Sequence, residues 1–461
     1  MVVTSVPKYA MLHVRINLHA PDGGRVAKGE SVGGAFAVPE CHRPLFGALA
    51  LHFHRERYKM KLQFDLSREY GLVLEGGGAK GAYQIGAWKA LREEGVKIRG
   101  LSGVSVGALN GALICMDDPE LAEEIWENIS YSQIMDVDDE KMDSVIRGDL
   151  KSIDWNALIQ DGLRVIREHG MDVTPLKNLI ARVCDEKVIR QSAMDFYIVT
   201  YSLSDRQLID VSAKEIPEGL IADMLLASAY LPAFKRERLH GKRYIDGGVS
   251  DRVPLDSLIN RGYRDIIVLR IFGFGVEKRI RIPDDVRVID VAPRQNLGGI
   301  LEFDSARSRR NIKLGYYDTK RMLYGLAGNE YYLDMDLTEE EAYERLQDMA
   351  FRYLTAEEEH SQEETGRKQG LFLGGKRAEV LTDLRRINEE ILPETGRRLL
   401  KNRSWSYREL YTAILEKTAI ALRISRYEIY KETVLLERIR EKLQTYGEAG
   451  KELPVYSAFF E

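Results

Sequence analysis

The amino-acid sequence predicts an α/β protein with a mostly parallel central sheet, followed by a helical extension at the C-terminus. Two observations carry this prediction. Between residues 70 and 325, short apolar runs alternate with amphipathic helical segments, a pattern typical of βαβ units and parallel sheets. From residue 333 onward Glu, Arg, Lys and Leu prevail, and Thr338-x-x-Glu341 and Ser406-x-x-Glu409 have the form of capping boxes that begin helices.

The elements of the first part follow one another in a regular order. Expected strands occupy residues 71–75, 98–102, 196–202, 207–211, 243–245, 265–271 and 286–291. Expected helices occupy residues 82–94, 106–116, 220–230, 254–260 and 305–324. The third and fourth strands are close enough in sequence to form a hairpin. Residues 117–187 are expected to be helical and acidic on their outer faces, with Thr174 as a helix cap before Pro175.

Composition excludes several classes of protein. The 461 residues include 67 Lys and Arg against 72 Asp and Glu, a net charge of −5, so a nucleic-acid partner held by phosphate neutralisation is not expected. Three widely spaced cysteines exclude a disulfide framework and are typical of a reducing compartment. No apolar stretch reaches the roughly 18 residues of a membrane span, and we identify no secretory signal. We therefore expect a cytoplasmic protein.

The first 59 residues differ from the rest of the chain. They hold five of the eight histidines, and Cys41-His42 and His52-x-His54 resemble fragments of a metal site. No second cysteine pair or spaced carboxylates complete such a site. We expect residues 1–59 to be a poorly ordered extension that binds no metal, and the functional chain to begin near Met60.

A stripe of side chains follows one face of a helix expected in the C-terminal region. It consists of Tyr411, Ile414, Leu415, Thr418, Leu422 and Ile424. Such a stripe is most often core that docks helices on one another. The alternative is contact with a second copy of the chain or with a membrane. Residues 333–461 are therefore expected to be a helical region of unknown role, and homo-oligomerisation through its helices stays open.

A glycine-rich loop joins the first strand to the first helix. In Gly76-Gly77-Gly78-Ala79-Lys80-Gly81, backbone N–H groups gather beside the positive N-terminus of a helix, an arrangement that holds an anion. The loop also satisfies G-x-G-x-x-G, but a dinucleotide site needs a carboxylate at the end of the next strand. This chain has Leu101-Ser102-Gly103 there. A dinucleotide-binding (Rossmann) oxidoreductase is thus the weaker alternative, and a P-loop is excluded because neither Ser nor Thr follows Lys80.

The sequence Gly103-Val104-Ser105-Val106-Gly107 lies at the second strand-to-helix junction. A serine with a glycine two residues away on each side is able to occupy a sharp elbow, since larger side chains at those flanks would clash. Its hydroxyl would then project from the turn. A serine nucleophile also needs a base.

Histidine is the usual base, but the chain offers no convincing one. After Met60 only His169, His240 and His360 remain, and their contexts are a helix end, a hairpin tip and a charged helical run. Asp246-Gly247-Gly248 follows a later strand and supplies a carboxylate. A serine–aspartate pair is therefore the better fit.

These motifs together resemble the patatin-like phospholipase family. The order GGGAKG, GVSVG, ASAYLPAF and YIDGG is similar to the family's glycine-rich oxyanion loop, G-x-S-x-G serine and D-G-[AG] aspartate. The resemblance covers roughly residues 70–324 and implies a three-layer α/β/α fold. One departure is Lys80, where many members carry arginine. Lysine keeps the charge but lacks the planar fork of arginine.

The resemblance implies which residues are catalytic. Ser105 would be the nucleophile and Asp246 the general base, with no metal and no cofactor. The implied oxyanion hole draws on Gly76, Gly77, Gly78, Lys80, Gly81 and Val106. The amides of Gly77 and Gly78 are the first candidates, with Val106 as a helper. The motif glycines are Gly103, Gly107, Gly247 and Gly248.

The implied activity is a lipid acyl hydrolase that cleaves fatty-acyl esters of phospholipids or lysophospholipids through an acyl-enzyme. A neutral-lipid lipase or an acyltransferase would share the dyad, so both alternatives stay open. Access to a lipid implies transient contact with a membrane surface, to which a net charge of −5 gives no general attraction. The helical region between serine and aspartate is our hypothesis for a lid over the acyl pocket.

Overall fold

The computed structural model describes residues 62–136, 139, 172–232, 234–235, 237–365, 382–401, 404–448 and 459–460. All of these residues fall within one compact unit. The predictions for residues 1–59, for a chain start near Met60 and for His169 lie outside the described residues.

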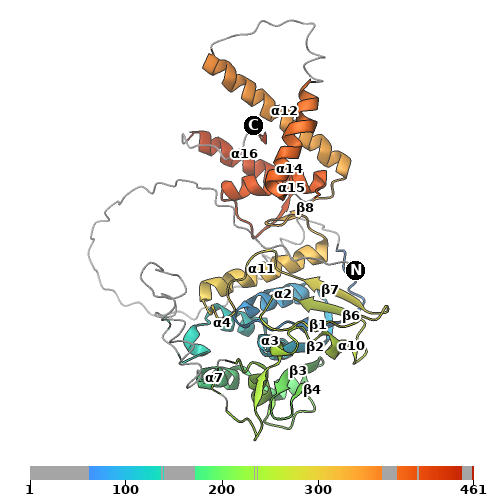
Figure 1. Cartoon of the computed structure of the whole chain (residues 1–461), viewed down its shortest axis with the longest axis vertical. Helices are drawn as coiled ribbons and strands as arrows, with labels where there is room; N and C mark the ends of the chain where they lie inside the picture. The colour runs from blue at the N-terminus through green and yellow to red at the C-terminus, as the bar shows by residue number, and fades with distance from the viewer. Residues whose placement is uncertain are drawn as a thin grey trace, which may run out of the picture. The chain divides into compact units, whose positions relative to one another are not determined.

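A seven-stranded sheet forms the centre of the first part of the chain (Figure 1). Its strands are β1 (Glu69–Leu74), β2 (Lys97–Val104), β3 (Asp195–Ser202), β4 (Gln207–Ser212), β5 (Tyr244–Asp246), β6 (Asp265–Leu269) and β7 (Arg287–Val291). The order is β4-β3-β2-β1-β6-β7, and β5 pairs with β3. Neighbours from β3 through β7 in this order are parallel, whereas β4 and β5 pair with β3 antiparallel. The prediction of a mostly parallel sheet is confirmed.

Helices cover both faces of this sheet. On one face, a large core joins the strands to α2 (Ala82–Glu93), α3 (Val106–Met116), α4 (Pro119–Glu127), α9 (Ile221–Ser228) and α11 (Ser305–Tyr324). On the other face, a smaller core includes Leu258 of α10 (Leu255–Ile259). Because successive side chains of a strand point to opposite faces, Leu72 and Leu74 belong to the first core and Val73 to the second.

The predicted elements agree closely with the observed ones. Each expected strand and helix of the first part ends within two residues of its predicted bounds. One local detail was wrong, because Thr174 is the first residue of α7 (Thr174–Val183) and not its cap. The Asp172 Oδ1 atom instead accepts the Thr174 N–H at 2.7 Å. After α7 comes α8 (Glu186–Gln191). Of residues 117–187, the region of the lid hypothesis, residues 137, 138 and 140–171 lie outside the described residues, so the hypothesis stays untested.

The C-terminal part is mainly helical, as predicted. Its helices are α12 (Glu339–Thr365), the π-helical turn η4 (Ile387–Ile391), α14 (Leu392–Leu400), α15 (Tyr407–Ala421) and α16 (Glu432–Glu448). Both capping boxes form, at Thr338 with Glu341 and at Ser406 with Glu409. A parallel pair, β8 (Tyr332–Asp334) with β9 (Ile429–Lys431), was not predicted. Three residues are too few to display the period of a strand.

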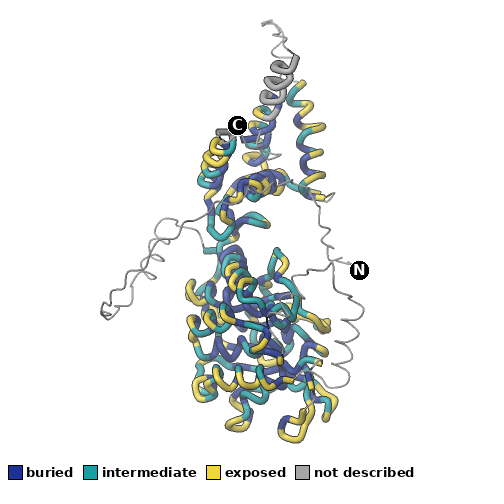
Figure 2. Tube along the Cα trace, turned by 90° about the vertical axis from the view of Figure 1, so that its left-hand side faces the viewer, coloured by how far each residue is buried: buried dark blue, intermediate teal, exposed yellow. Residues whose placement is uncertain are grey.

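The stripe on α15 and the residues after it is core. All six of its side chains are buried, and all but Thr418 belong to an apolar cluster separate from the cores of the sheet. Figure 2 shows buried residues through the interior of the sheet-containing part and along the C-terminal helices. Within the described residues, no helix combines the length and apolar character that crossing a bilayer requires.

Replacing a side chain of this stripe is expected to cost stability. Ile414 has no exposed surface, so Ile414→Ala should lower the free energy of unfolding of the C-terminal part by about 2–5 kcal/mol through a cavity. Lys417→Ala, on the exposed side of the same helix, should stay within about 0.5 kcal/mol. Urea denaturation followed by circular dichroism measures both. An Ile414→Ala protein with unchanged stability but a lower oligomeric mass would place the stripe at an interface between copies.

Candidate active site

Ser105 occupies a strained turn between β2 and α3. Its backbone has φ 57° and ψ −130°, a combination that residues other than glycine rarely adopt. The turn fits between its neighbours because the flanking positions carry no side chain. A Cβ atom on Gly103 would overlap the carbonyl of Gly107, and one on Gly107 would overlap the carbonyl of Leu74. The two glycines of the motif are therefore required by close backbone approach, as predicted.

The backbone of Ser105 is held by a second serine. The Ser105 N–H donates to Ser228 Oγ at 2.8 Å, and the Ser228 hydroxyl donates to the Val199 carbonyl at 2.6 Å. Ser228 is the last residue of α9 and is completely buried. This link ties the elbow both to α9 and to β3. Ser105 itself is 6% exposed.

Asp246 ends β5 and lies at the same site. Its N–H donates to the Tyr230 carbonyl at 2.7 Å, and its Oδ1 accepts the Gly248 N–H at 2.8 Å. Burial raises the pKa of Asp246 to about 6, against the lowering effect of hydrogen bonds from the Ser105 side chain and the Gly248 backbone. The carboxylate is thus a stronger base than an ordinary aspartate and is still ionised at neutral pH.

The glycine-rich loop leaves two of its amides without an acceptor. The Gly76 N–H donates to the Arg252 carbonyl at 3.0 Å and the Ala79 N–H to the Ile300 carbonyl at 2.8 Å. The amides of Gly77 and Gly78 have no hydrogen-bond acceptor among the residues that the structure describes. Gly76, Gly77, Gly78, Ser105 and Asp246 line one cavity. Val106 is the first residue of α3, so its N–H has no acceptor within the helix.

Lys80 and Gly81, also predicted for the oxyanion hole, have other contacts. The Lys80 ammonium donates to the Phe272 carbonyl at 2.6 Å, and the backbone N–H of Lys80 donates to the Gly77 carbonyl at 3.4 Å. Burial lowers the pKa of Lys80. A Cβ atom on Gly81 would overlap the Val106 side chain. The Gly81 carbonyl accepts a hydrogen bond from Asn110 Nδ2 at 3.0 Å. Both residues therefore hold the loop in place.

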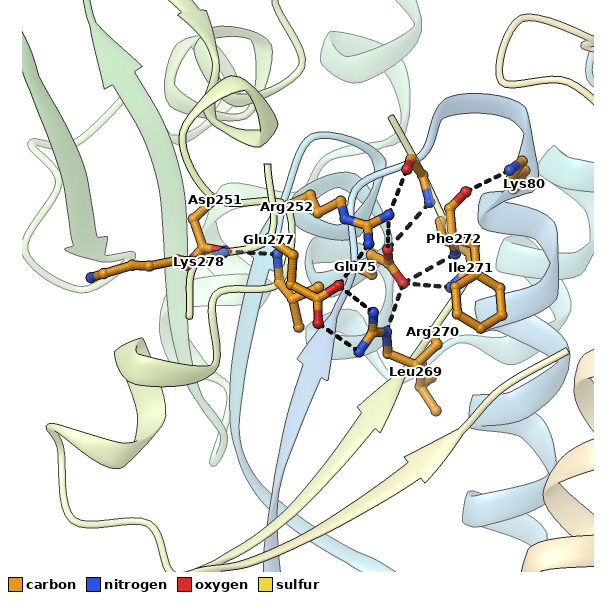
Figure 3. A network of polar contacts seen from close by, with 12 residues as sticks. Glu75, Lys80, Asp251, Arg252, Leu269, Arg270, Ile271, Phe272, Glu277 and Lys278 are labelled. Carbon is orange, nitrogen blue, oxygen red and sulfur yellow. Dashed lines mark hydrogen bonds and ion pairs between the residues drawn. The ribbon is translucent and has the colours of Figure 1, made fainter. Parts of the chain in front are cut away.

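A buried carboxylate at the end of β1 organises the loops around the site (Figure 3). Glu75 has no exposed surface. It accepts the N–H groups of Ile271, Phe272 and Gly273 at 2.7, 3.1 and 3.2 Å. Successive N–H groups that converge in this way form an anion-binding nest, which here is filled by a side chain of the protein itself.

Two arginines neutralise Glu75. Arg252 Nη1 and Arg270 Nε each lie 3.1 Å from one of its carboxylate oxygens. Both guanidinium groups also contact Glu277, at 2.6 Å and 2.7 Å. Arg252 further donates to the Gly273 carbonyl at 2.7 Å, and its own carbonyl accepts the Gly76 N–H. The network therefore connects the glycine-rich loop to the segments that follow β5 and β6.

Two cavities meet at Ser105. The larger has a volume of about 830 Å³, part of which is open to solvent, and its apolar walls come from α3, α4, α7 and α9. Its lining includes Leu109, Trp126, Ile180, Leu225 and Phe303. The smaller, also partly open, has a volume of about 470 Å³ and is lined by the glycine loop and Asp246. Ser105, Gly78 and Leu231 line both.

The structure brings Ser105, Asp246 and the glycine loop together at one cavity, and His240, the histidine whose side chain it describes, lies apart from them. His240 lies at a turn, as expected, with Nε2 2.6 Å from Asp223 Oδ2, and it lines neither cavity. His360 falls in α12. Sequence reasoning missed Glu75, Ser228, Arg252 and Arg270. Glu75 gave a signal, as a carboxylate at the end of an otherwise apolar strand, and Ser228 lies in the ASAYLPAF segment that contributed to the family resemblance.

Removing the charge of Glu75 should destabilise the fold. Glu75→Gln would leave the partly buried Arg252 and Arg270 with less compensation, so we expect a loss of about 3 kcal/mol in unfolding free energy. Glu277→Gln is the matched control, because Glu277 contacts the same arginines but its side chain is 43% exposed, and it should cost no more than about 1 kcal/mol. Equal losses in chemical denaturation would contradict a special role of the buried carboxylate.

Comparison with known proteins agrees with this geometry. The family model described as patatin-like phospholipase matches residues 72–259. A lysophospholipase, nte1, of Aspergillus terreus is 54% identical over 50 residues, which are 11% of this chain and 3% of that protein. The patatin-like phospholipase domain-containing protein ZK370.4 of Caenorhabditis elegans is 27% identical over 197 residues, or 43% of this chain and 13% of that one. The chain thus matches only a small part of these relatives.

Among solved structures, VipD from Legionella pneumophila aligns with 85% of this chain and 89% of its own, at 14% identity and a TM-score of 0.34. The family match spans the glycine loop, the serine elbow and the aspartate. Residues 72–259 of this chain therefore form a patatin-like phospholipase domain.

Proposed function

We propose that the domain at residues 70–325 hydrolyses fatty-acyl esters of lipids with Ser105 as nucleophile and Asp246 as general base. The observation that carries the proposal is the position of Ser105. Its side chain is near enough to Asp246 to lower the pKa of that carboxyl. The residue also lines both the apolar cavity and the cavity with the Gly77 and Gly78 amides, for which the described part of the chain offers no acceptor. An ester carbonyl at this junction would have its acyl chain in the large cavity.

In the proposed first step, the Ser105 Oγ attacks the carbonyl carbon while Asp246 takes the hydroxyl proton. The negative charge that develops on the carbonyl oxygen is stabilised by the N–H groups of Gly77 and Gly78, with Val106 as a further donor. Collapse of this intermediate breaks the ester bond. The leaving alcohol takes the proton from Asp246, and the acyl group stays on Ser105.

In the second step, Asp246 accepts a proton from water, which attacks the acyl-enzyme. The fatty acid leaves and Ser105 recovers its proton. The Asp246 carboxylate is a weaker base than histidine, so a larger part of the rate depends on the oxyanion hole. The sequence of steps requires neither metal nor cofactor.

We propose phospholipids or lysophospholipids as substrates. The apolar lining of the large cavity suits an acyl chain, and one relative is named a lysophospholipase. A neutral-lipid lipase or an acyltransferase would use the same dyad. The oxidoreductase alternative is not favoured, because β2 ends in Val104 and leads into the serine elbow without a carboxylate. Lipid substrates also imply transient contact with a membrane surface.

Removal of either dyad residue should abolish hydrolysis. We expect Ser105→Ala and Asp246→Asn each to lower the turnover of lysophosphatidylcholine by at least about a thousandfold, because nucleophile and base act together. Release of fatty acid measures the turnover. A fluorophosphonate probe should label the unmodified chain and not Ser105→Ala.

His240→Gln is the control for a serine–histidine mechanism. Since His240 contacts Asp223 and lines neither cavity, this variant should keep its turnover within about twofold of the unmodified chain. Loss of activity in His240→Gln together with retention in Asp246→Asn would overturn the proposed dyad.

The pH profile should report the raised pKa of Asp246. The base must be ionised, so kcat/KM should be constant at high pH and fall about tenfold per pH unit below a midpoint near 6. An ordinary aspartate would place this midpoint near 3.9. Initial rates with a soluble short-chain ester between pH 4 and 8 test the expectation, and a midpoint near 4 would contradict the burial argument.

A further inference from the structure

Exposed apolar side chains gather beside the smaller cavity. Among the described residues, seven large apolar side chains are exposed: Val188, Val249, Phe272, Phe274, Val276, Ile282 and Tyr407. Four of the seven belong to residues 272–282, and Val249 follows the Asp246 loop. Phe274 is 77% exposed and, with Val249, also lines the cavity that contains Asp246. The apolar surface therefore borders the entrance to the site.

The segment after β6 presents its two sides differently. Phe272, Phe274 and Val276 alternate with Gly273 and Gly275. A Cβ atom on Gly273 would overlap the Gly76 carbonyl, and one on Gly275, at φ 125°, would overlap the Gly248 carbonyl. The glycine side thus packs directly on both catalytic loops. The large side chains between the glycines are exposed.

Hydrogen bonds fix this segment in place. The Val276 N–H donates to the Gly248 carbonyl at 3.0 Å, and the Val276 carbonyl accepts the Arg252 N–H at 2.7 Å. Phe272 has φ 48°, which brings its N–H onto Glu75 together with those of its neighbours (Figure 3). The backbone that bears the exposed aromatic side chains is therefore held by hydrogen bonds, although exposure of these side chains to water is unfavourable.

Cationic side chains follow the apolar ones. Lys278, Arg279 and Arg281 are exposed, and Lys278 pairs with Asp256. Arg279 and Arg281 have no ion-pair partner within the described part of the chain. The neighbouring acid Glu277 is neutralised by Arg252 and Arg270. This local excess of positive charge contrasts with the net charge of −5 for the whole chain.

We propose that residues 272–282, together with Val249, form the surface with which the protein docks on a lipid bilayer. Phe272, Phe274, Val276 and Ile282 enter the interfacial layer, and Arg279 and Arg281 contact anionic headgroups. The inference rests on the proposed function, because a lipid substrate must pass from the bilayer to Ser105. A bilayer fits better than a protein partner, since apolar and cationic groups adjoin at the entrance of an acyl-ester site.

Vesicle binding by the full chain in a Ser105→Ala background tests the proposal. Flotation with vesicles of phosphatidylcholine alone, and of phosphatidylcholine with phosphatidylserine at a ratio of about 4:1, measures binding without hydrolysis. Combined Phe274→Ser, Val276→Ser and Ile282→Ser should lower the partition coefficient at least about tenfold on both vesicles. Arg279→Gln with Arg281→Gln should lower it about tenfold only on vesicles that contain phosphatidylserine.

Val188→Ser is the matched control, because Val188 is 40% exposed but lies on α8, away from both cavities at Ser105. It should bind like the background protein, and all variants should keep its thermal unfolding temperature. Unchanged binding by the triple variant, or no binding by the background protein, would overturn the proposal. So would a vesicle-free dimer that the triple variant converts to monomer, since a second copy would then cover the surface.

The outcome is separable from that of the proposed function. Hydrolysis of a soluble short-chain ester by the unmodified chain needs no vesicle, whereas the binding assay needs no catalysis. Binding that depends on residues 272–282 in a protein without esterase activity would reject the hydrolase and keep the docking surface. Esterase activity without such binding would reject the docking surface and leave the proposed hydrolase activity standing.

Discussion

Three loops from distant parts of the sequence meet at the site, and the Glu75 carboxylate joins them. Glu75 leads directly into the glycine loop, accepts three consecutive amides after β6 and pairs with Arg252 after β5. A buried carboxylate without partners would be prohibitively costly. With five donors it makes a single arrangement of these loops strongly preferred.

Side-chain amides support the same loops from the opposite side. Gln84 Nε2 donates to the Glu75 carbonyl at 2.8 Å, and Gln84 in turn accepts from Asn110, which accepts from Trp126. These residues lie on α2, α3 and α4, and all are buried. Backbone and side chain of one glutamate are thus held by separate networks. Preorganisation of the loop amides is the feature on which electrostatic stabilisation of an oxyanion depends.

Much of the fold could be predicted because its signals are local. The prediction of α3 rested on a segment of small residues after the serine motif, and that of α11 on Asp304 as a cap, which the structure shows; the bounds predicted for both helices were correct. Glycine spacing around Ser105 and Asp246 pointed to the two residues that the structure brings together. The short pair of β8 and β9 could not be predicted, because three-residue strands depend on tertiary contacts and have no period of their own.

The supporting residues of the site were missed for a related reason. Ser228 contacts backbone atoms of Ser105 and Val199, and Arg252 contacts two carboxylates and the Gly273 carbonyl. These partners are distant in sequence, and nothing near Ser228 or Arg252 in the sequence indicates them. The lysine at position 80 shows the same limit. From the sequence alone, it was open whether a lysine could replace the two-donor contact of an arginine at this position. In the structure, the Lys80 ammonium makes one hydrogen bond, to the Phe272 carbonyl, for which a single donor is enough.

The helix α9 contributes both to the support of Ser105 and to the lining of the large cavity. Ser228, at the end of α9, holds the amide of Ser105, the proposed nucleophile, while Leu225 and Ala229, on and just after the same helix, line the large apolar cavity. If this cavity takes an acyl chain as proposed, a chain too bulky for it would displace α9 and, through one turn of helix, the Ser105 turn. The proposed mechanism would then couple the choice of acyl-chain length to the alignment of the attacking oxygen, so a poorly fitting lipid would lose reactivity as well as affinity.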